Sequence, residues 1–267
     1  MTASNVNLPR WCAAHIFLSK AMDEFLYLSL GPLLIEWKRT AVVKRFFFIR
    51  YSEGGPHIRL RMMPGRAVPP SLLLLRLADT FEAFRRGEAP EFGGRIVETR
   101  YDRSADYFGE NAESVYSELL NEQTSLLALA LCSRSFKSRA QVVASGAGAL
   151  SYLIQASSVD RESARRITAQ SSRFASQVLA DLGWSRQETG ASTSEKFKAI
   201  LRRVSTDMSP ELRATAAART ARLLKRARQQ TRGGRFVAVH SMHLFCNKIG
   251  ILPPEEFQIF EALREIA

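Results

Sequence analysis

The chain has 267 residues, 46% of them hydrophobic, which is enough to bury a core in one large domain or two small ones, and we favour two. No run approaches the roughly 18 uncharged apolar residues of a membrane span, and the first ten residues lack the basic and apolar regions of a signal peptide. We therefore expect a soluble cytoplasmic protein without a membrane partner. A formal net charge of +12 indicates an acidic partner, either nucleic acid, anionic lipid or an acidic peptide.

The first hundred residues alternate between strand and helix patterns. In chain order they favour a strand at 11–18, an amphipathic helix at 21–38, two strands at 42–51 and 57–63, a helix at 71–86 and a strand at 96–102. The order βαββαβ is that of a ferredoxin-like unit, a sheet with two helices on one face. We predict this unit over residues 1–109.

The hairpin at 42–63 holds the most informative pattern. Side chains alternate along a strand, so His57, Arg59 and Arg61 share one face and the apolar residues between them share the other. Three such donors on one face are typical of a surface that holds an anion, a carboxylate or a polarised carbonyl. The alternative is a solvated outer face of the sheet.

After Gly109 the composition shifts to helix formers, and Ser185 to Thr193 reads as a loop. The sequence predicts helices at 111–133, 139–155, 160–182, 194–206, 210–231, 236–248 and 254–266. Asp160 is suited to cap its helix, and the glycines of 145–149 suit close helix packing. We therefore predict the α+β class, with the ferredoxin-like sheet unit and a larger helical part, 110–267, packed together as one compact domain.

Metal binding and acid–base chemistry are both conceivable for the helix at 236–248. His240 and His243 lie three residues apart and share a face, but no third ligand accompanies them, so we expect no metal site. Cys12, Cys132 and Cys246 are too far apart for a thiolate zinc site or a disulfide scaffold. His243 is a candidate general acid or base, and the alternative is a core histidine with hydrogen-bond partners.

Basic residues crowd the segment 210–235, whose helix is either a solvated face or a dock for an acidic peptide. Nucleic-acid binding is less favoured because the helix lacks aromatic side chains for stacking and any groove-reading motif. We select Arg222 and Arg226 as candidate contacts for an acidic peptide. Glu255 and Glu256 suit the positive end of a helix dipole, and we assign them no chemistry.

Three separated segments together resemble the thiopeptide-type bacteriocin biosynthesis domain, which is the C-terminal domain of lantibiotic dehydratases. These are the strand pair 47–61, the tyrosine-containing, glycine-ended stretch 101–109, and the helix 241–250 with its histidine and asparagine. Their order and spacing agree over nearly the whole chain. The resemblance implies a cofactor-independent enzyme that acts on a ribosomal peptide with an acidic leader.

The resemblance also implies roles for individual residues. Arg59, Arg61 and His243 occupy functional positions, and Tyr107 is a further candidate for proton transfer. We assign substrate binding to a second set of polar residues. These are Arg50, His57, Tyr101 and Asn247.

The family includes enzymes that eliminate glutamate from glutamylated Ser or Thr, and pyridine synthases that join two dehydroalanines in a formal [4+2] aza-cycloaddition. Where elimination domains tend to carry an acidic residue and an arginine, this sequence has Ser104 and Tyr107. The difference favours a pyridine synthase. A standalone glutamate eliminase is the first alternative and a non-enzymatic basic peptide- or RNA-binding module the second. The oligomeric state, monomer or homodimer, stays open.

Overall fold

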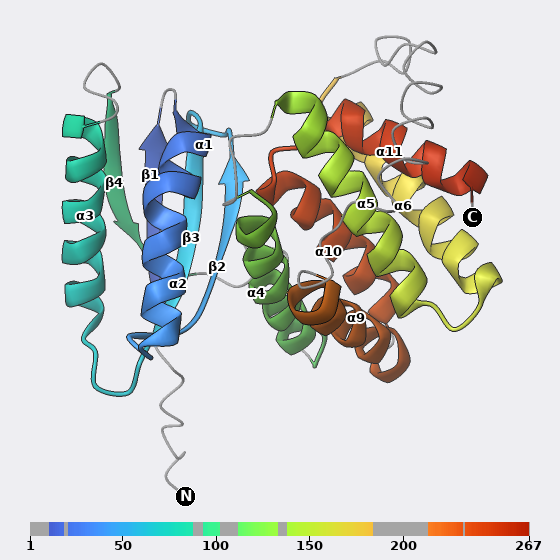
Figure 1. The fold of residues 1–267 in the computed structure, drawn as a ribbon, viewed down its shortest axis with the longest axis horizontal. Helices are drawn as coiled ribbons and strands as arrows, with labels where there is room; N and C mark the ends of the chain where they lie inside the picture. Colours follow the sequence, from blue (N-terminus) through green and yellow to red (C-terminus); the bar gives the residue numbers. More distant parts are fainter. Residues whose placement is uncertain are drawn as a thin grey trace, which may run out of the picture. The chain divides into compact units, whose positions relative to one another are not determined.

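The structure is a computed structural model that describes residues 11–18, 21–87, 93–101, 112–132, 138–183, 213–231 and 233–266. The chain divides into two compact units, Met1–Arg103 and Ser104–Ala267. The first unit contains the sheet and the second is helical (Figure 1), so the predicted α+β class is confirmed. The predicted boundary after residue 109 lies outside the described residues, as do the predicted loop 185–193 and helix 194–206. Within the described ranges, no helix is long and apolar enough to cross a membrane.

The first unit has the predicted ferredoxin-like topology. In chain order its elements are β1 (Cys12–Leu18), α1 (Met22–Glu24), η1 (Phe25–Leu30), α2 (Gly31–Arg39), β2 (Val43–Tyr51), β3 (His57–Pro64), α3 (Pro70–Gly87) and β4 (Gly94–Thr99). The strands form one antiparallel sheet in the order β2-β3-β1-β4. β3 therefore lies inside the sheet, between β2 and β1.

Two predicted elements of this unit differ from the structure. The helix expected at 21–38 contains a π-helical segment, η1, just before Pro32, which has no N–H to donate to the preceding turn. β4 begins at Gly94, two residues before the prediction, and ends at Thr99. Glycine has little strand propensity, but at position 94 a Cβ would lie 2.6 Å from the Phe17 carbonyl oxygen, so close packing requires it.

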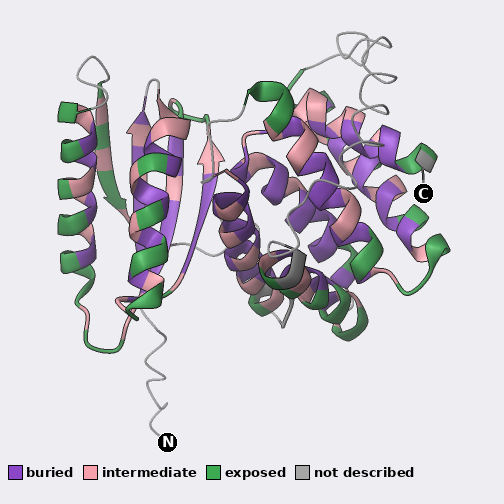
Figure 2. Cartoon of the chain, viewed as in Figure 1, coloured by how far each residue is buried: buried purple, intermediate pink, exposed green. Residues whose placement is uncertain are grey.

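The alternation of side chains across the sheet creates one apolar face. Ile58, Leu60 and Met62 of β3 are fully buried, as are Phe46 and Phe48 of the neighbouring β2. Figure 2 shows most of β2 and β3 in the colour of buried residues. The helical segments α1–α2 and α3 pack against this face of the sheet. At their junction the ring of Phe25 lies 5.4 Å from that of Phe81 and 5.2 Å from that of Phe84.

The second unit is a bundle around a buried central helix. Its described elements are α4 (Ala112–Cys132), α5 (Arg139–Ser157), α6 (Arg161–Asp181), η3 (Arg213–Ala217), α9 (Ala218–Gln230), α10 (Gly234–Lys248) and α11 (Pro253–Ile266). α10 packs against α4, α6 and α9 and is buried on nearly all sides, which agrees with its lack of a polar face. Apart from helix 194–206, the helices expected after residue 110 are confirmed to within a few residues.

Local details of the bundle agree with the sequence, with one correction. Asp160 caps α6 by accepting a hydrogen bond from the Ser163 backbone N–H at 2.6 Å. At Gly146 a Cβ would lie 2.5 Å from Ile249 Cδ1, so the close packing expected there is confirmed. The basic helix does not extend to Arg235, because α9 ends at Gln230 and Arg235 belongs to α10.

Replacing Gly234 with alanine should destabilise the second unit. A Cβ there would lie 2.1 Å from the Ala227 carbonyl oxygen and 2.6 Å from Arg228 Cα, so the α9–α10 connection would have to move. We expect a loss of about 1–3 kcal/mol in the free energy of unfolding, measured by urea denaturation. Gly87→Ala is the matched control, because nothing lies within 4 Å of its new Cβ. Equal stability of the two variants would contradict the prediction.

Candidate functional site

The face of the sheet opposite the helices carries the predicted cationic residues. Strand register brings His15 of β1 beside Arg59 and Phe17 beside His57, so β1 adds an imidazole and a ring to this face. His57 is 1% exposed and Arg61 is 3% exposed. The alternative of a solvated outer face is therefore wrong for these two residues. We call the set His15, Phe17, His57, Arg59 and Arg61 the cationic face.

Aromatic rings surround the guanidinium groups of the cationic face. Arg59 Cζ lies 3.4 Å from the centre of the Tyr51 ring, and Arg61 Cζ lies 5.6 Å from that of Tyr101. Both distances are within the range of cation–π attraction. The predicted residues His57, Arg59, Arg61 and Tyr101 are thus brought together, and close stacking on Tyr51 restricts how Arg59 can point.

Hydrogen bonds indicate that His57 is neutral. Its Nδ1 lies 2.8 Å from the Gly55 carbonyl oxygen, which can only accept, so Nδ1 carries the proton. Arg59 Nε donates to His57 Nε2 at 3.4 Å, a long contact in which Nε2 must accept. Burial, with the nearby Arg59 and Arg61, lowers the pKa of His57, although the bond to Gly55 opposes this shift.

The second histidine of the cationic face is also neutral near pH 7. Burial and the charges of Arg61, His57 and Arg59 lower the pKa of His15 to about 4. The rings of His15 and His57 lie 4.9 Å apart and are tilted by 31°. Permanent positive charge on this face therefore comes from the arginines, while the imidazoles act as neutral donors and acceptors.

Arg50, predicted to bind substrate, lies on the opposite face. It is opposite Ile58 in the strand register, so its side chain points toward the helices. There it forms an ion pair with Asp23 and donates to the Tyr27 hydroxyl at 2.9 Å. The structure does not bring it together with Arg59 and Arg61. The alternation of side chains along paired strands could have shown this from the sequence, because it places Arg50 on the face opposite Arg59 and Arg61.

A second cluster lies in the helical unit, where His243 of α10 meets Glu256 of α11. His243 Nδ1 is 2.8 Å from Glu256 Oε2, and the glutamate side chain is only 3% exposed. Burial by itself would lower the pKa of His243, but the Glu256 charge and hydrogen bond outweigh it, so the pKa is raised. A histidine held in this way can carry a proton near neutral pH and transfer it.

Glu256 is the functional candidate that sequence reasoning missed. Its position in the first turn of a helix already explained a carboxylate there, because negative charge is favourable at that end of the helix dipole. The carboxylate is instead buried against a histidine thirteen residues earlier. The remaining signal was weak: Glu256 lies on the same helix face as the buried Ile259 and Phe260.

The two histidines of α10 differ in protonation although they lie three residues apart. The ring of His240 stacks on that of Phe236 with centroids 5.6 Å apart, and burial together with His243 and Lys248 lowers its pKa to about 3. In the part of the chain that the structure describes, no three His, Cys, Asp or Glu side chains are grouped as metal ligands. His240 is therefore a neutral histidine packed in the core.

The other predicted residues are more scattered. Asn247 is half-buried one turn after His243, and its carbonyl accepts from the Gly250 N–H at 3.0 Å. Arg222 and Arg226 are exposed on α9. Tyr107 and Ser104 lie outside the described residues.

The last residue of α10 is a buried cation that the sequence analysis did not single out. Lys248 is fully buried, and its Nζ donates to Asn121 Oδ1 at 2.6 Å and to Thr124 Oγ1 at 3.0 Å, both on α4. Such a group is retained only where hydrogen bonds replace its lost hydration. Lys248 ties the carboxyl end of α10 to α4.

These features define the class: an α+β protein in which a ferredoxin-like unit presents arginines and neutral histidines, and a helical unit presents a histidine–carboxylate pair. The family model described as lantibiotic biosynthesis dehydratase C-term matches residues 11–267. The chain belongs to this family, which confirms the resemblance seen in the sequence. The family's description places it in the biosynthesis of peptide antibiotics.

Solved structures with the same fold include a lantibiotic dehydratase and a pyridine synthase. A tRNA-dependent lantibiotic dehydratase, MibB from Microbispora sp. 107891, superposes with a TM-score of 0.65 at 16% identity over 99% of this chain and 28% of that one. The pyridine synthase TbtD from thiomuracin biosynthesis gives 0.58 at 14% identity, over 96% of this chain and 97% of that one. TsrL gives 0.62 at 16% identity, over 96% and 94%.

The chain thus spans little more than a quarter of the dehydratase and nearly all of the pyridine synthase. Among curated proteins, no sequence matches significantly. At these identities the structural likeness establishes the fold.

Acid should destabilise the protein through its neutral histidines. The pKa values of His15 and His240 lie near 4 and 3, against an ordinary 6.5, so protons bind preferentially to the unfolded chain. Their contribution to stability is complete above pH 6.5 and is lost as the pH falls toward 4 and then 3. His243 has the opposite sign: its contribution is present at low pH and is lost as the pH rises through its raised pKa.

The measurement is urea denaturation of the wild type and of His240→Phe at pH 7 and pH 5. We expect the variant to lose less stability between these two values, because it has no imidazole to protonate at this position. An equal pH dependence in the two proteins would contradict the assignment.

Proposed function

We propose that this protein is a pyridine synthase of thiopeptide biosynthesis. Its substrate would be a leader-bearing ribosomal peptide that contains azoles and two dehydroalanines. A formal [4+2] aza-cycloaddition would join the two alkenes into a six-membered nitrogen ring, and loss of water and of the leader peptide would make the ring aromatic. The resemblance of the sequence to this family implies a reaction without a cofactor, and the ring formation involves no net oxidation or reduction.

The observation that carries the proposal is the chemistry of the cationic face. Cycloaddition requires one amide to be held as its imidic tautomer beside the second alkene, so positioning supplies much of the rate enhancement. His57, with its proton on Nδ1, and neutral His15 are suited to contacts with uncharged amides and azoles. Arg59, stacked on Tyr51, and Arg61, within cation–π range of Tyr101, are suited to donate to polarised carbonyl oxygens.

The His243–Glu256 pair supplies a group for the proton transfers that follow ring closure. A raised pKa lets His243 hold a proton near neutral pH, as loss of water requires, and Glu256 fixes the orientation of the ring. Tyr107 remains a predicted partner in this step, and Tyr101 and Asn247 remain predicted substrate contacts. The near-complete overlap with a solved pyridine synthase is consistent with this assignment.

Elimination of glutamate from a glutamylated peptide is the second candidate. The His243–Glu256 pair favours it, because elimination needs a group that takes the α-proton. The arginines of the cationic face would supply the positive charge for the departing carboxylate. The structural likeness to a lantibiotic dehydratase agrees with this alternative. The substitution of Ser104 and Tyr107 for the acid and arginine typical of elimination domains is the reason we place it second.

Turnover of two defined peptides distinguishes the candidates. The purified protein is incubated with a dehydrated, azole-containing precursor and, separately, with its glutamylated form, and products are identified by mass spectrometry. We expect ring formation with release of the leader from the first peptide. Activity only on the glutamylated peptide would reject the proposal, and retained turnover in an Arg59→Ala, His243→Ala double variant would reject the site.

The exposed side of α9 is our proposed dock for an acidic leader. The helix carries five basic residues and no acidic one, and four of them are exposed: Arg219, Arg222, Lys225 and Arg226. Such a surface attracts an acidic peptide over a range of about 10 Å at moderate salt.

Reversing two charges on α9 should weaken leader binding. For Arg222→Glu, Arg226→Glu we expect an increase in Kd of about tenfold, equivalent to about 1.4 kcal/mol, with a smaller salt dependence. Fluorescence anisotropy with a labelled acidic leader peptide measures it. Arg76→Glu, Arg165→Glu makes the same charge change on exposed parts of α3 and α6 and is the control. An unchanged Kd in the α9 variant would remove this dock.

A further inference from the structure

The connection between α10 and α11 is short and fixed at both ends. α10 ends in a Schellman motif, in which the Gly250 N–H donates to Asn247 at 3.0 Å and the Ile251 N–H donates to Cys246 at 2.9 Å. Gly250 has a φ of 78°, which glycine adopts without strain. α11 begins after Leu252, whose N–H donates to Glu255 Oε2 at 2.7 Å.

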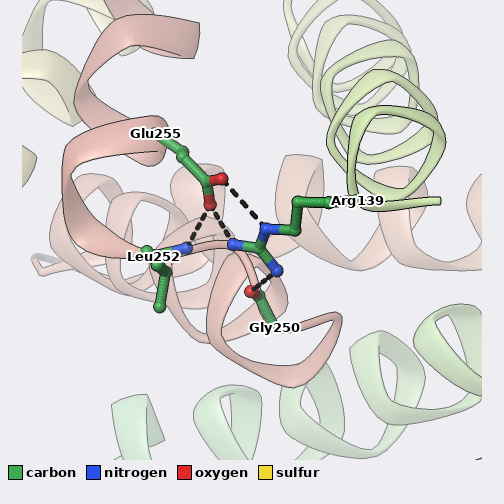
Figure 3. Close-up of polar contacts among 4 residues, drawn as sticks. All are labelled: Arg139, Gly250, Leu252 and Glu255. Atoms are coloured by element: carbon green, nitrogen blue, oxygen red, sulfur yellow. Dashed lines mark hydrogen bonds and ion pairs between the residues drawn. The ribbon is translucent and has the colours of Figure 1, made fainter.

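Arg139, the first residue of α5, bonds to both sides of this connection (Figure 3). Its Nε donates to Glu255 Oε1 at 3.0 Å, and its Nη2 donates to Glu255 Oε2. Its Nη1 donates to the Gly250 carbonyl oxygen. One planar guanidinium therefore holds the end of α10 and the start of α11 together.

His243 and Glu256 meet across the same connection, one from each helix. Their hydrogen bond depends on how the two helices are oriented, and Glu256 directly follows the residue that Arg139 grips. We propose that Arg139 is a positioning residue, which holds α10 and α11 in the arrangement that lets His243 and Glu256 bond. The inference deepens the proposed function, on which its kinetic consequence rests.

An ordinary surface ion pair would not have this effect. Arg139 is about half exposed, and exposed pairs contribute little stability on average. Arg139 differs in making a bidentate contact with a carboxylate and a third bond to a backbone carbonyl, a geometry that fixes direction as well as distance. Arg166 and Glu162, by contrast, form an exposed pair within a single helix.

The pKa of His243 in the substrate-free protein is the test, measured by NMR titration of its imidazole nitrogens. The charged or titratable groups that set it are Glu256, Lys248 and the neighbouring His240. In Arg139→Gln we expect this pKa to fall, because Glu256 moves away from the ring. Removing a positive charge would by itself raise the pKa, so a fall reports the geometry.

Two further variants keep the test decisive. Arg166→Gln removes an equal charge from α6 and should leave the pKa of His243 unchanged. Arg139→Lys keeps the positive charge but loses the bidentate contact and should also lower the pKa, which provides an answer if Arg139→Gln does not fold. An unchanged His243 pKa in either folded variant at the connection, or an equal fall in Arg166→Gln, overturns the inference.

Turnover adds a separate readout. With the dehydrated precursor we expect Arg139→Gln to lower kcat by about tenfold or more with little change in KM, because a misplaced proton-transfer group slows chemistry and not binding. Unchanged kcat in a folded variant that has lost the His243–Glu256 bond overturns the kinetic consequence. The NMR result needs no substrate, so it stands or falls independently of whether the protein is a pyridine synthase.

Discussion

Side-chain alternation along β3 is the constraint on which the first unit depends. Ile58, Leu60 and Met62 are fully buried on the helix-covered face, so Arg59 and Arg61 must point to the other side. A slip of one residue would place both guanidinium groups in an apolar core, at a cost of several kcal/mol for each unpaired ion. The apolar core thus fixes the register, and the register fixes the cationic face.

Much of this face could be predicted because period-two alternation is a local property of the sequence. The same rule explains the placement of Arg50, which is paired with Ile58 and therefore faces Asp23 and Tyr27. The contribution of His15 could not be predicted in this way. It comes from a strand more than forty residues earlier, and only the pairing of β1 with β3 brings it beside Arg59.

In the helical unit, the sequence predicted the helices well but not the contacts of their polar side chains. Helix positions followed from apolar spacing and caps, whereas the partners of individual polar groups did not. His240 and His243 share a helix face, yet their pKa values shift in opposite directions, because only His243 meets a carboxylate from α11. Lys248 likewise finds its partners on α4, more than 120 residues earlier in the chain. Such pairs depend on tertiary packing, for which a single sequence carries little signal.

The position of β3 inside the sheet has a consequence for how a peptide can be held there. β2 and β1 already occupy the backbone hydrogen-bonding groups on both sides of β3, so a peptide cannot join it as an added strand. Only the edge strands β2 and β4 offer that mode of recognition. Under the proposed function, a peptide bound by Arg59 and Arg61 therefore lies on the face of the sheet and does not extend it as a further strand. Under the same proposal, side chains and their rings would distinguish modified residues of the peptide, which backbone pairing cannot do.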